Sequence, residues 1–107
     1  MKVKITIVVA EQEPLVLEKG EHMIGRGDAE SGVFPEIDLE PYDTEAKVSR
    51  KHAVLKISHS IVTIEDVGSL NGTFVNRKPR LAVNTKQQLH SGDEVAIGAT
   101  FMRIEFI

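Results

Sequence analysis

Three short polar segments of the sequence carry side chains that could bind an anion. The first is Gly25-Arg26-Gly27, in which an arginine stands between two glycines. A guanidinium presents a planar fork of N–H donors that suits phosphate or carboxylate oxygens, and the glycines leave the backbone free to bend. The alternative is a solvated arginine in an ordinary turn, and this segment alone does not decide between the two.

The second segment, Lys47-Val48-Ser49-Arg50-Lys51-His52, places three cations and a hydroxyl within six residues of a chain whose formal net charge is −3. Ser49 can donate a hydrogen bond to a phosphate oxygen, and Lys47 or Arg50 can supply positive charge. A solvated basic turn would have the same composition. For His52, we favour a hydrogen bond that fixes the loop over a contact with a ligand.

The third segment, Asp66-Val67-Gly68-Ser69-Leu70-Asn71-Gly72-Thr73, contains Asn-Gly, which is a strong turn signal. A purely structural turn is therefore one interpretation. The other is a clamp for an extended peptide, because the carboxamide of Asn71 offers both a donor and an acceptor to a peptide backbone.

Catalytic and metal chemistry have less support. Ser49, His52 and Asp66 could be assembled into a hydrolytic triad, but the serine does not stand in a Gly-x-Ser-x-Gly setting. The sequence has no cysteine, which excludes disulfides, thiolate metal sites and a cysteine nucleophile. None of the histidines pairs with a carboxylate at a spacing typical of metal ligands. We therefore expect no enzyme, no metal site and no cofactor.

Length and charge predict one domain over residues 1–107. A net charge of −3 argues against a nucleic-acid or membrane-surface binder, because both need a broad positive field. No stretch reaches the roughly 18 apolar residues that a membrane span requires. The first residues lack the cleavage site of a signal peptide, so we expect a cytoplasmic protein.

The alternation of apolar and polar residues is typical of β-strands. Between residues 2 and 9, Val3, Ile5 and Ile7 alternate with polar residues, as in a half-buried strand. The same pattern or a short apolar run predicts further strands at 15–18, 22–25, 53–57, 61–65, 73–75, 87–89, 94–98 and 101–106. Residues 27–47 are predicted to form a long loop with one brief strand. Many short strands joined by glycine-rich turns indicate an all-β sandwich or barrel.

Taken in order, the polar segments resemble the forkhead-associated (FHA) domain family. The resemblance rests on Gly-Arg, Ser-Arg-Lys-His, Asp-Val-Gly-Ser-Leu-Asn-Gly-Thr-Phe-Val-Asn and Gly-Asp-Glu-Val-Ala-Ile-Gly, and it extends from about residue 20 to residue 106. It implies a reader of phosphorylated motifs, built as a two-sheet β-sandwich of about eleven strands with ligand-binding loops at one end. It also implies phosphothreonine-dependent binding to partner proteins, and hence a signalling adaptor downstream of Ser/Thr kinases.

The resemblance also implies roles for single residues. Arg26 and the hydroxyl of Ser49 would bind the phosphate, and Arg50 would add a phosphate or main-chain contact. Lys47 occupies a place that in some members reads the third residue after the phosphothreonine, and Asn71 would hydrogen-bond the peptide backbone. Three further residues look architectural and would hold the loops: Gly25, His52 and Gly72.

Two features depart from the family pattern. Leu70 stands where many members have a threonine that reaches the phosphate, so binding should weaken or depend more on Arg50. Residues 28–46 form a longer segment than in the shortest members, and this segment is acidic. We expect it to be a solvated loop, although it could order against the domain or repel acidic peptides.

Phosphate-independent functions are the alternatives within the same family. Some members dock folded partners through these loops or through a sheet face, and a degenerate domain could serve only in oligomerisation. The joint presence of Arg26, Ser49 and Asn71 favours the phosphate-dependent mode.

Overall fold

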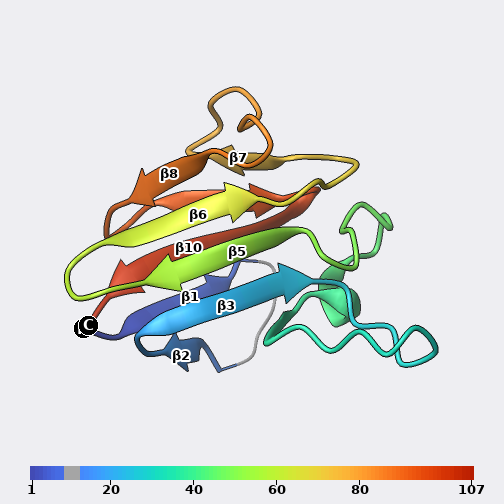
Figure 1. Cartoon of the computed structure of the whole chain (residues 1–107), viewed down its shortest axis with the longest axis horizontal. Coiled ribbons are helices and arrows are strands. Elements are labelled where there is room, and N and C mark those ends of the chain that lie inside the picture. Colours follow the sequence, from blue (N-terminus) through green and yellow to red (C-terminus); the bar gives the residue numbers. More distant parts are fainter. Residues whose placement is uncertain (9–12) are drawn as a thin grey trace.

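The computed structural model describes residues 1–8 and 13–107 and forms a β-sandwich of two five-stranded sheets (Figure 1). The first sheet contains β1 (Val3–Ile7), β2 (Leu15–Leu17), β7 (Thr73–Val75), β9 (Glu94–Ile97) and β10 (Thr100–Phe106), in the order β2-β1-β10-β9-β7. The second contains β3 (Gly20–Gly25), β4 (Ile37–Asp38), β5 (Ala53–Ile57), β6 (Val62–Asp66) and β8 (Lys86–Leu89), in the order β4-β3-β5-β6-β8.

The predicted two-sheet sandwich is confirmed, with small differences in its elements. The described residues form ten strands where about eleven were expected, and an isolated bridge joins Asp28 to Val33. The strand expected at 61–65 runs from Val62 to Asp66, and the end of the strand expected at 2–9 lies outside the described residues. A 3₁₀ turn, η1 (Glu40–Tyr42), was not predicted; Pro41 has the fixed φ that such a first turn requires.

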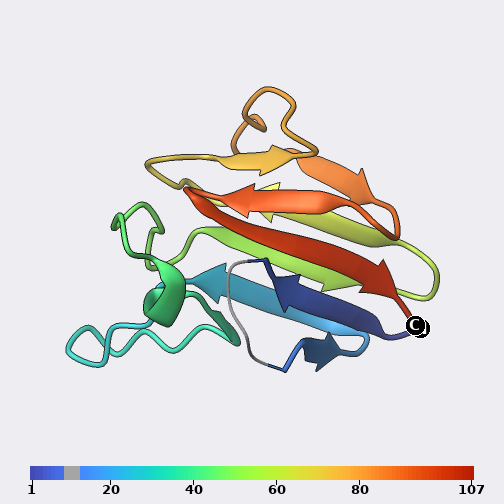
Figure 2. The same cartoon turned by 180° about the vertical axis from the view of Figure 1, so that it is seen from behind.

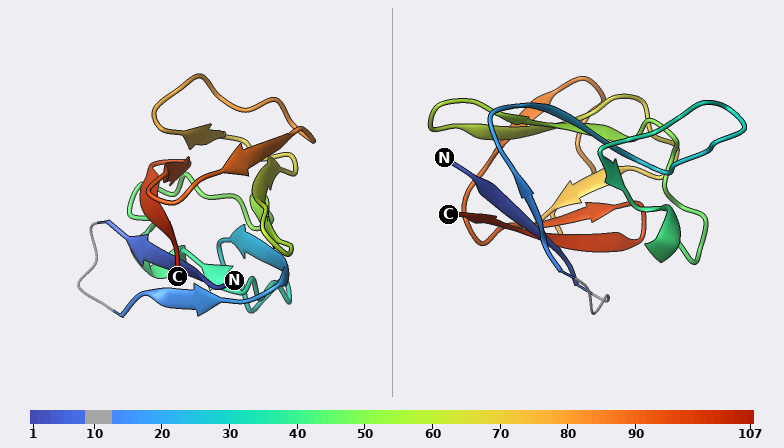
Figure 3. Two further views of the ribbon diagram at one scale, coloured as in Figure 1. Left: turned by 90° about the vertical axis from the view of Figure 1, so that its left-hand side faces the viewer. Right: turned by 90° about the horizontal axis from the view of Figure 1, so that it is seen from below.

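The core lies between the two layers, which the right-hand view of Figure 3 shows one above the other. Alternate residues of each strand point inward, so that β1 and β10 bury Ile5 and Ile104 as cross-strand partners. The facing sheet buries Leu55 and Ile64, which are paired across β5 and β6. Each fully buried aliphatic side chain of this size contributes about 2 kcal/mol of hydrophobic stabilisation. The strands therefore form a firm support for the loops.

The polar segments lie together at one end of the sandwich, far from both termini (Figures 1 and 2). Strands β3 and β6 run toward this end, while β5 and β10 start from it. The turn from β3 to β4, the connection from β4 through η1 to β5, and the turn from β6 to β7 therefore meet there. This placement agrees with the expectation of loops gathered at one end.

His22 ties the start of β3 to neighbouring segments. Its Nδ1 lies 2.7 Å from Oε2 of Glu36 and its Nε2 lies 2.7 Å from the carbonyl oxygen of Glu18. Since both partners accept, the geometry suits a doubly protonated ring that donates from both nitrogens. Burial alone would lower the pKa of His22, but the hydrogen bonds to Glu36 and to the Glu18 carbonyl raise it above 6.5.

We predict that His22 stabilises the fold in acid and loses this effect as the pH rises. Because its pKa is higher in the folded state than in the unfolded chain, the contribution is complete below about pH 6.5 and disappears as the pH passes the folded pKa. Glu36→Gln should lower the pKa of His22 and flatten this part of the stability profile. NMR titration of the imidazole would measure the shift; an unchanged pKa in Glu36→Gln would show that Glu36 does not cause it.

Candidate functional site

Arg26 follows β3 and is fixed by the segment that precedes β5. Its backbone N–H donates to the Ser49 carbonyl at 3.1 Å, and its Nε donates to the Val48 carbonyl at 3.2 Å. The chains approach so closely that a Cβ at Gly25 would collide with the backbone carbonyl of Arg50. No described residue accepts a hydrogen bond from the two terminal guanidinium nitrogens of Arg26, which are therefore available to an anion.

Ser49 joins the two loops that flank Arg26. Its Oγ accepts the N–H of Leu70 at 3.1 Å, and its own backbone N–H donates to Nδ1 of His52 at 3.0 Å. A hydroxyl that accepts one hydrogen bond still has a proton to donate. Ser49 can therefore hold the Leu70 loop and donate to a bound oxygen at the same time.

The imidazole of His52 is fully buried between these loops. Nδ1 accepts from Ser49, and Nε2 lies 2.8 Å from the Gly72 carbonyl, to which it must donate. Burial lowers the pKa of His52, in agreement with a neutral ring protonated at Nε2. Because both nitrogens have backbone partners, His52 does not accept from the Ser49 hydroxyl, and the arrangement is not a hydrolytic triad.

A buried carboxylate shapes the loop after β6. Asp66 is fully buried and accepts the N–H groups of Gly68 at 2.9 Å and Ser69 at 2.8 Å, together with the hydroxyls of Ser69 and Thr73. Burial by itself would raise the pKa of Asp66, but these hydrogen bonds lower it below its usual value. The Ser69 hydroxyl in turn accepts the N–H of Gly72 at 3.0 Å.

Asn71 is held at the tip of the same loop. Its Nδ2 donates to the Lys47 carbonyl at 3.2 Å, while no described residue donates to its Oδ1. Arg80, which the sequence did not single out, donates to the carbonyls of Ser69 at 2.7 Å and Leu70 at 3.3 Å. The position of Arg80 in the sequence did not indicate this role, because Arg80 belongs to a separate polar turn and reaches the loop only in the folded structure.

These loops enclose an open pocket of about 380 Å³. It contains four of the six residues proposed to bind a phosphopeptide: Arg26, Ser49, Leu70 and Asn71. The other four lining residues were not proposed as binding residues: Glu40, Asp43, Ala46 and Val48. Leu70 is 80% exposed, so it adds an apolar surface at the mouth of the pocket.

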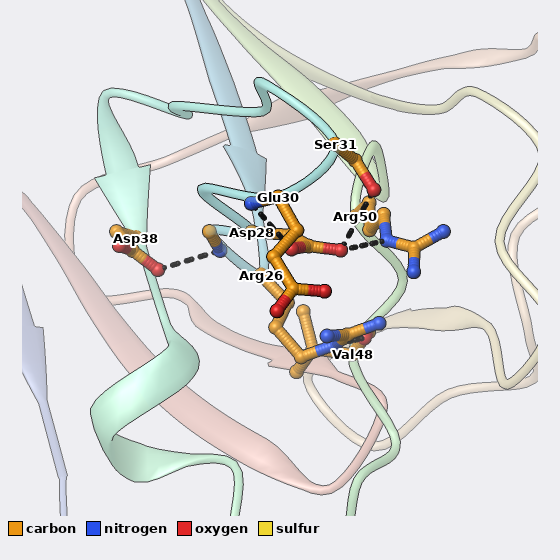
Figure 4. A network of polar contacts seen from close by, with 8 residues as sticks. Arg26, Asp28, Glu30, Ser31, Asp38, Val48 and Arg50 are labelled. Carbon is orange, nitrogen blue, oxygen red and sulfur yellow. Dashed lines mark hydrogen bonds and ion pairs between the residues drawn. The ribbon is translucent and has the colours of Figure 1, made fainter.

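The remaining two proposed residues, Arg50 and Lys47, do not line the pocket. Arg50 donates through Nε to Oδ2 of Asp28 at 2.7 Å, and Figure 4 shows this pair beside Arg26. The Lys47 side chain is exposed, and the contacts of this residue are made by its backbone, which donates to Asp43 and accepts from Asn71.

Most acidic residues of the segment 28–46 are exposed, as expected for a solvated loop, but two of its aspartates also order it against the domain. Asp43 accepts the N–H groups of Lys47 at 2.7 Å and Val48 at 3.0 Å. Asp38 accepts those of Gly27 at 2.9 Å and Glu40 at 3.0 Å. These carboxylates close turns because aspartate readily accepts nearby backbone N–H groups.

Within residues 1–8 and 13–107, no group of three or more His, Cys, Asp or Glu residues is arranged to hold a metal ion. No helix in the described part of the chain is both long and apolar enough to cross a membrane.

Comparison with known proteins identifies the family. The FHA domain model matches residues 22–98. The chain belongs to the FHA domain family. Its loops after β3, before β5 and after β6 carry the Gly-Arg, Ser-Arg-Lys-His and Ser-Leu-Asn-Gly-Thr motifs of the resemblance, and the structure brings these motifs to one pocket.

Relatives of this FHA domain include regulatory proteins. The chain is 38% identical over 98 residues to the oxoglutarate dehydrogenase inhibitor of Corynebacterium diphtheriae, a match that covers 87% of this chain and 63% of that protein. It is 34% identical over 89 residues to the glycogen accumulation regulator GarA of Mycobacterium tuberculosis, covering 78% and 51%. The chain thus spans roughly half to two thirds of the length of these relatives.

A solved structure shares the fold. The structure of Mycobacterium tuberculosis EmbR in complex with a low-affinity phosphopeptide superposes with a TM-score of 0.76 at 25% identity. The match covers 97% of this chain and 24% of the EmbR chain.

We predict that Asp66→Ala destabilises the domain and disorders the Asn71 loop. The change leaves two backbone N–H groups and two hydroxyls without their buried acceptor, which should lower the free energy of unfolding by about 3 kcal/mol. Urea denaturation would measure the loss. Thr73→Val, which removes one of these donors and keeps the carboxylate, is the matched control and should cost clearly less; equal losses would contradict the central role of Asp66.

Proposed function

We propose that this FHA domain binds phosphothreonine segments of partner proteins and acts as an adaptor under the control of Ser/Thr kinases. One observation carries the proposal. In a single pocket, Arg26, Ser49 and Asn71 each use one polar group to hold the loops and keep another available. The free groups are guanidinium N–H donors, a hydroxyl proton and a carboxamide oxygen.

These free groups match the chemistry of a phosphorylated peptide. A phosphate carries about −1.5 to −2 charges and three strong acceptor oxygens. In the proposed complex, the terminal nitrogens of Arg26 and the hydroxyl of Ser49 donate to these oxygens, each charged hydrogen bond contributing about 1.5–3 kcal/mol. Asn71 accepts a backbone N–H of the peptide through Oδ1. The apolar side chains that line the same pocket offer a surface for the threonine γ-methyl.

The relatives support a regulatory rather than a catalytic role. Two of them are named as an inhibitor and a regulator, and the EmbR structure contains a phosphopeptide. The proposal for this chain is therefore a binding module that needs no cofactor and acts by bringing a phosphorylated partner to the protein that contains it. A cytoplasmic location, where Ser/Thr kinases act on such partners, belongs to this proposal.

Docking of a folded partner without phosphate is the second candidate. Phe34 and Leu70 are 78% and 80% exposed, and both stand in loops at the end of the sandwich that holds the pocket. Single exposed apolar side chains are common on protein surfaces, so this candidate has less support than the phosphate-dependent mode. In this mode, affinity would depend on Leu70 and would not require phosphorylation.

We predict that Arg26→Ala and Ser49→Ala each weaken phosphothreonine binding strongly while the fold is retained. Each charged hydrogen bond that is lost should reduce the affinity about 10- to 100-fold. Fluorescence polarisation with a degenerate phosphothreonine peptide library would measure this, with phosphoserine and unmodified threonine libraries as controls. Retained affinity in both variants, or equal binding of all three libraries, would refute the proposal and favour phosphate-independent docking.

We predict that Asp28→Asn strengthens phosphopeptide binding through Arg50. Asp28 currently holds the Arg50 guanidinium, and an amide keeps the acceptor for the Glu30 N–H but releases the charge. Affinity should rise about threefold, as expected for one exposed ion pair. The double variant Asp28→Asn/Arg50→Ala tests whether Arg50 causes the gain in affinity. If the double variant binds as tightly as Asp28→Asn alone, the gain does not come from Arg50.

A further inference from the structure

The proposed phosphate pocket is lined by two carboxylates as well as one cation. Arg26 lines it together with Glu40 and Asp43. A dianionic phosphate that enters must therefore lie in a pocket whose lining includes two negative charges. This mixture of charges bears on which phosphorylated segments the pocket accepts.

Glu40 is held close to Arg26 by the backbone. Oδ1 of Asp38 accepts the N–H of Gly27 at 2.9 Å and the N–H of Glu40 at 3.0 Å, so one carboxylate oxygen links the residue after Arg26 to Glu40. Figure 4 shows Asp38 on the strand next to the Arg26 loop, with a dashed line to a backbone nitrogen. The side chain of Leu39 is fully buried, and its backbone N–H donates to the Gly25 carbonyl at 2.9 Å. The position of Glu40 relative to Arg26 is thus set by the fold.

The carboxylate of Glu40 has no hydrogen bond or ion pair with any described residue, unlike that of Asp43, which binds two backbone N–H groups. The nearby cations do not neutralise it in the structure. Arg26 lines the same pocket but forms no ion pair with a carboxylate of the described residues. Arg50 is paired with Asp28, and the Lys47 side chain is not among those that line the pocket. Glu40 therefore presents an unpaired negative charge to whatever enters the pocket.

We propose that Glu40 selects phosphothreonine segments that carry a lysine or arginine close to the phosphothreonine. The inference rests on the proposed function and specifies its ligand. A phosphate alone would experience repulsion from Glu40, whereas a basic side chain beside it would form an ion pair with the carboxylate. An extended peptide advances about 3.3 Å per residue, so a basic residue within about two positions of the phosphothreonine can reach the same pocket.

Three matched sets of phosphothreonine peptides test this inference. They are identical except for lysine, alanine or glutamate at the two positions on each side of the phosphothreonine. At low salt, the lysine set should bind the wild-type domain about threefold more tightly than the alanine set, and the glutamate set should bind more weakly still. These differences should shrink as the salt concentration rises.

Variants of Glu40 separate its effect from the general acidity of the segment. Glu40→Gln should remove the preference for lysine, and Glu40→Lys should reverse it toward glutamate. Glu45→Gln is the matched control, because Glu45 is an exposed carboxylate of the same segment that does not line the pocket. It should keep the preference of the wild type.

The outcomes distinguish this inference from the proposed function. If the alanine set binds and Arg26→Ala weakens this binding as predicted, but wild type shows no preference for lysine, only the role of Glu40 is overturned. It is also overturned if Glu40→Gln keeps the preference or if Glu45→Gln loses it equally. If no phosphothreonine set binds the wild-type domain, or if Arg26→Ala leaves the affinity unchanged, the proposed function is overturned as well.

Discussion

The buried imidazole of His52 is the constraint on which the pocket depends. It accepts the backbone N–H of Ser49 and donates to the backbone carbonyl of Gly72, so that it fixes two loops that are far apart in the sequence. Only a neutral ring protonated at Nε2 can make both bonds, and burial favours that form by lowering the pKa of His52. His22 is the opposite case, because two acceptors around it favour the charged ring.

At this end of the sandwich, polar side chains use some of their hydrogen-bonding groups to hold the loops and leave other groups free at the surface. Asp66 faces the interior, and its carboxylate is fully used by the loop after β6. Arg26, Ser49 and Asn71 lie farther out, where one group of each holds the loops. A polar atom that already has a structural partner is held in place, which lowers the entropic cost of ordering it around a ligand. The pocket is therefore preorganised by the same bonds that shape its loops.

The sequence predicted the parts of this structure that follow from a periodic pattern of apolar residues or from a recognisable motif. Alternating residues such as Ile5 and Ile7 predicted the strands, and the order of the polar segments predicted the loops that meet. The contacts of the acidic segment could not be predicted in the same way. The Arg50–Asp28 pair joins two side chains 22 residues apart, and such polar contacts depend on how loops pack, which no periodicity encodes. The bonds of Asp38 and Asp43 to nearby backbone followed a known tendency of aspartate, but only the fold shows which N–H groups are in reach.

The acidity of the domain and a site for an anion are compatible because the relevant charges act over different ranges. At physiological ionic strength, charges separated by more than about 8 Å of solvent are largely screened, so the net charge of −3 has little effect at contact distance. In the proposed complex, Arg26 acts by direct contact and dominates the affinity. In the proposed complex, the carboxylates within contact range change the relative affinities of ligands with different charges near the phosphothreonine. Specificity is such a difference in affinity. Asp38 accepts the N–H groups that place Glu40 near Arg26, so the hydrogen bonds that shape the loop also determine which negative charge would face a ligand in the proposed complex.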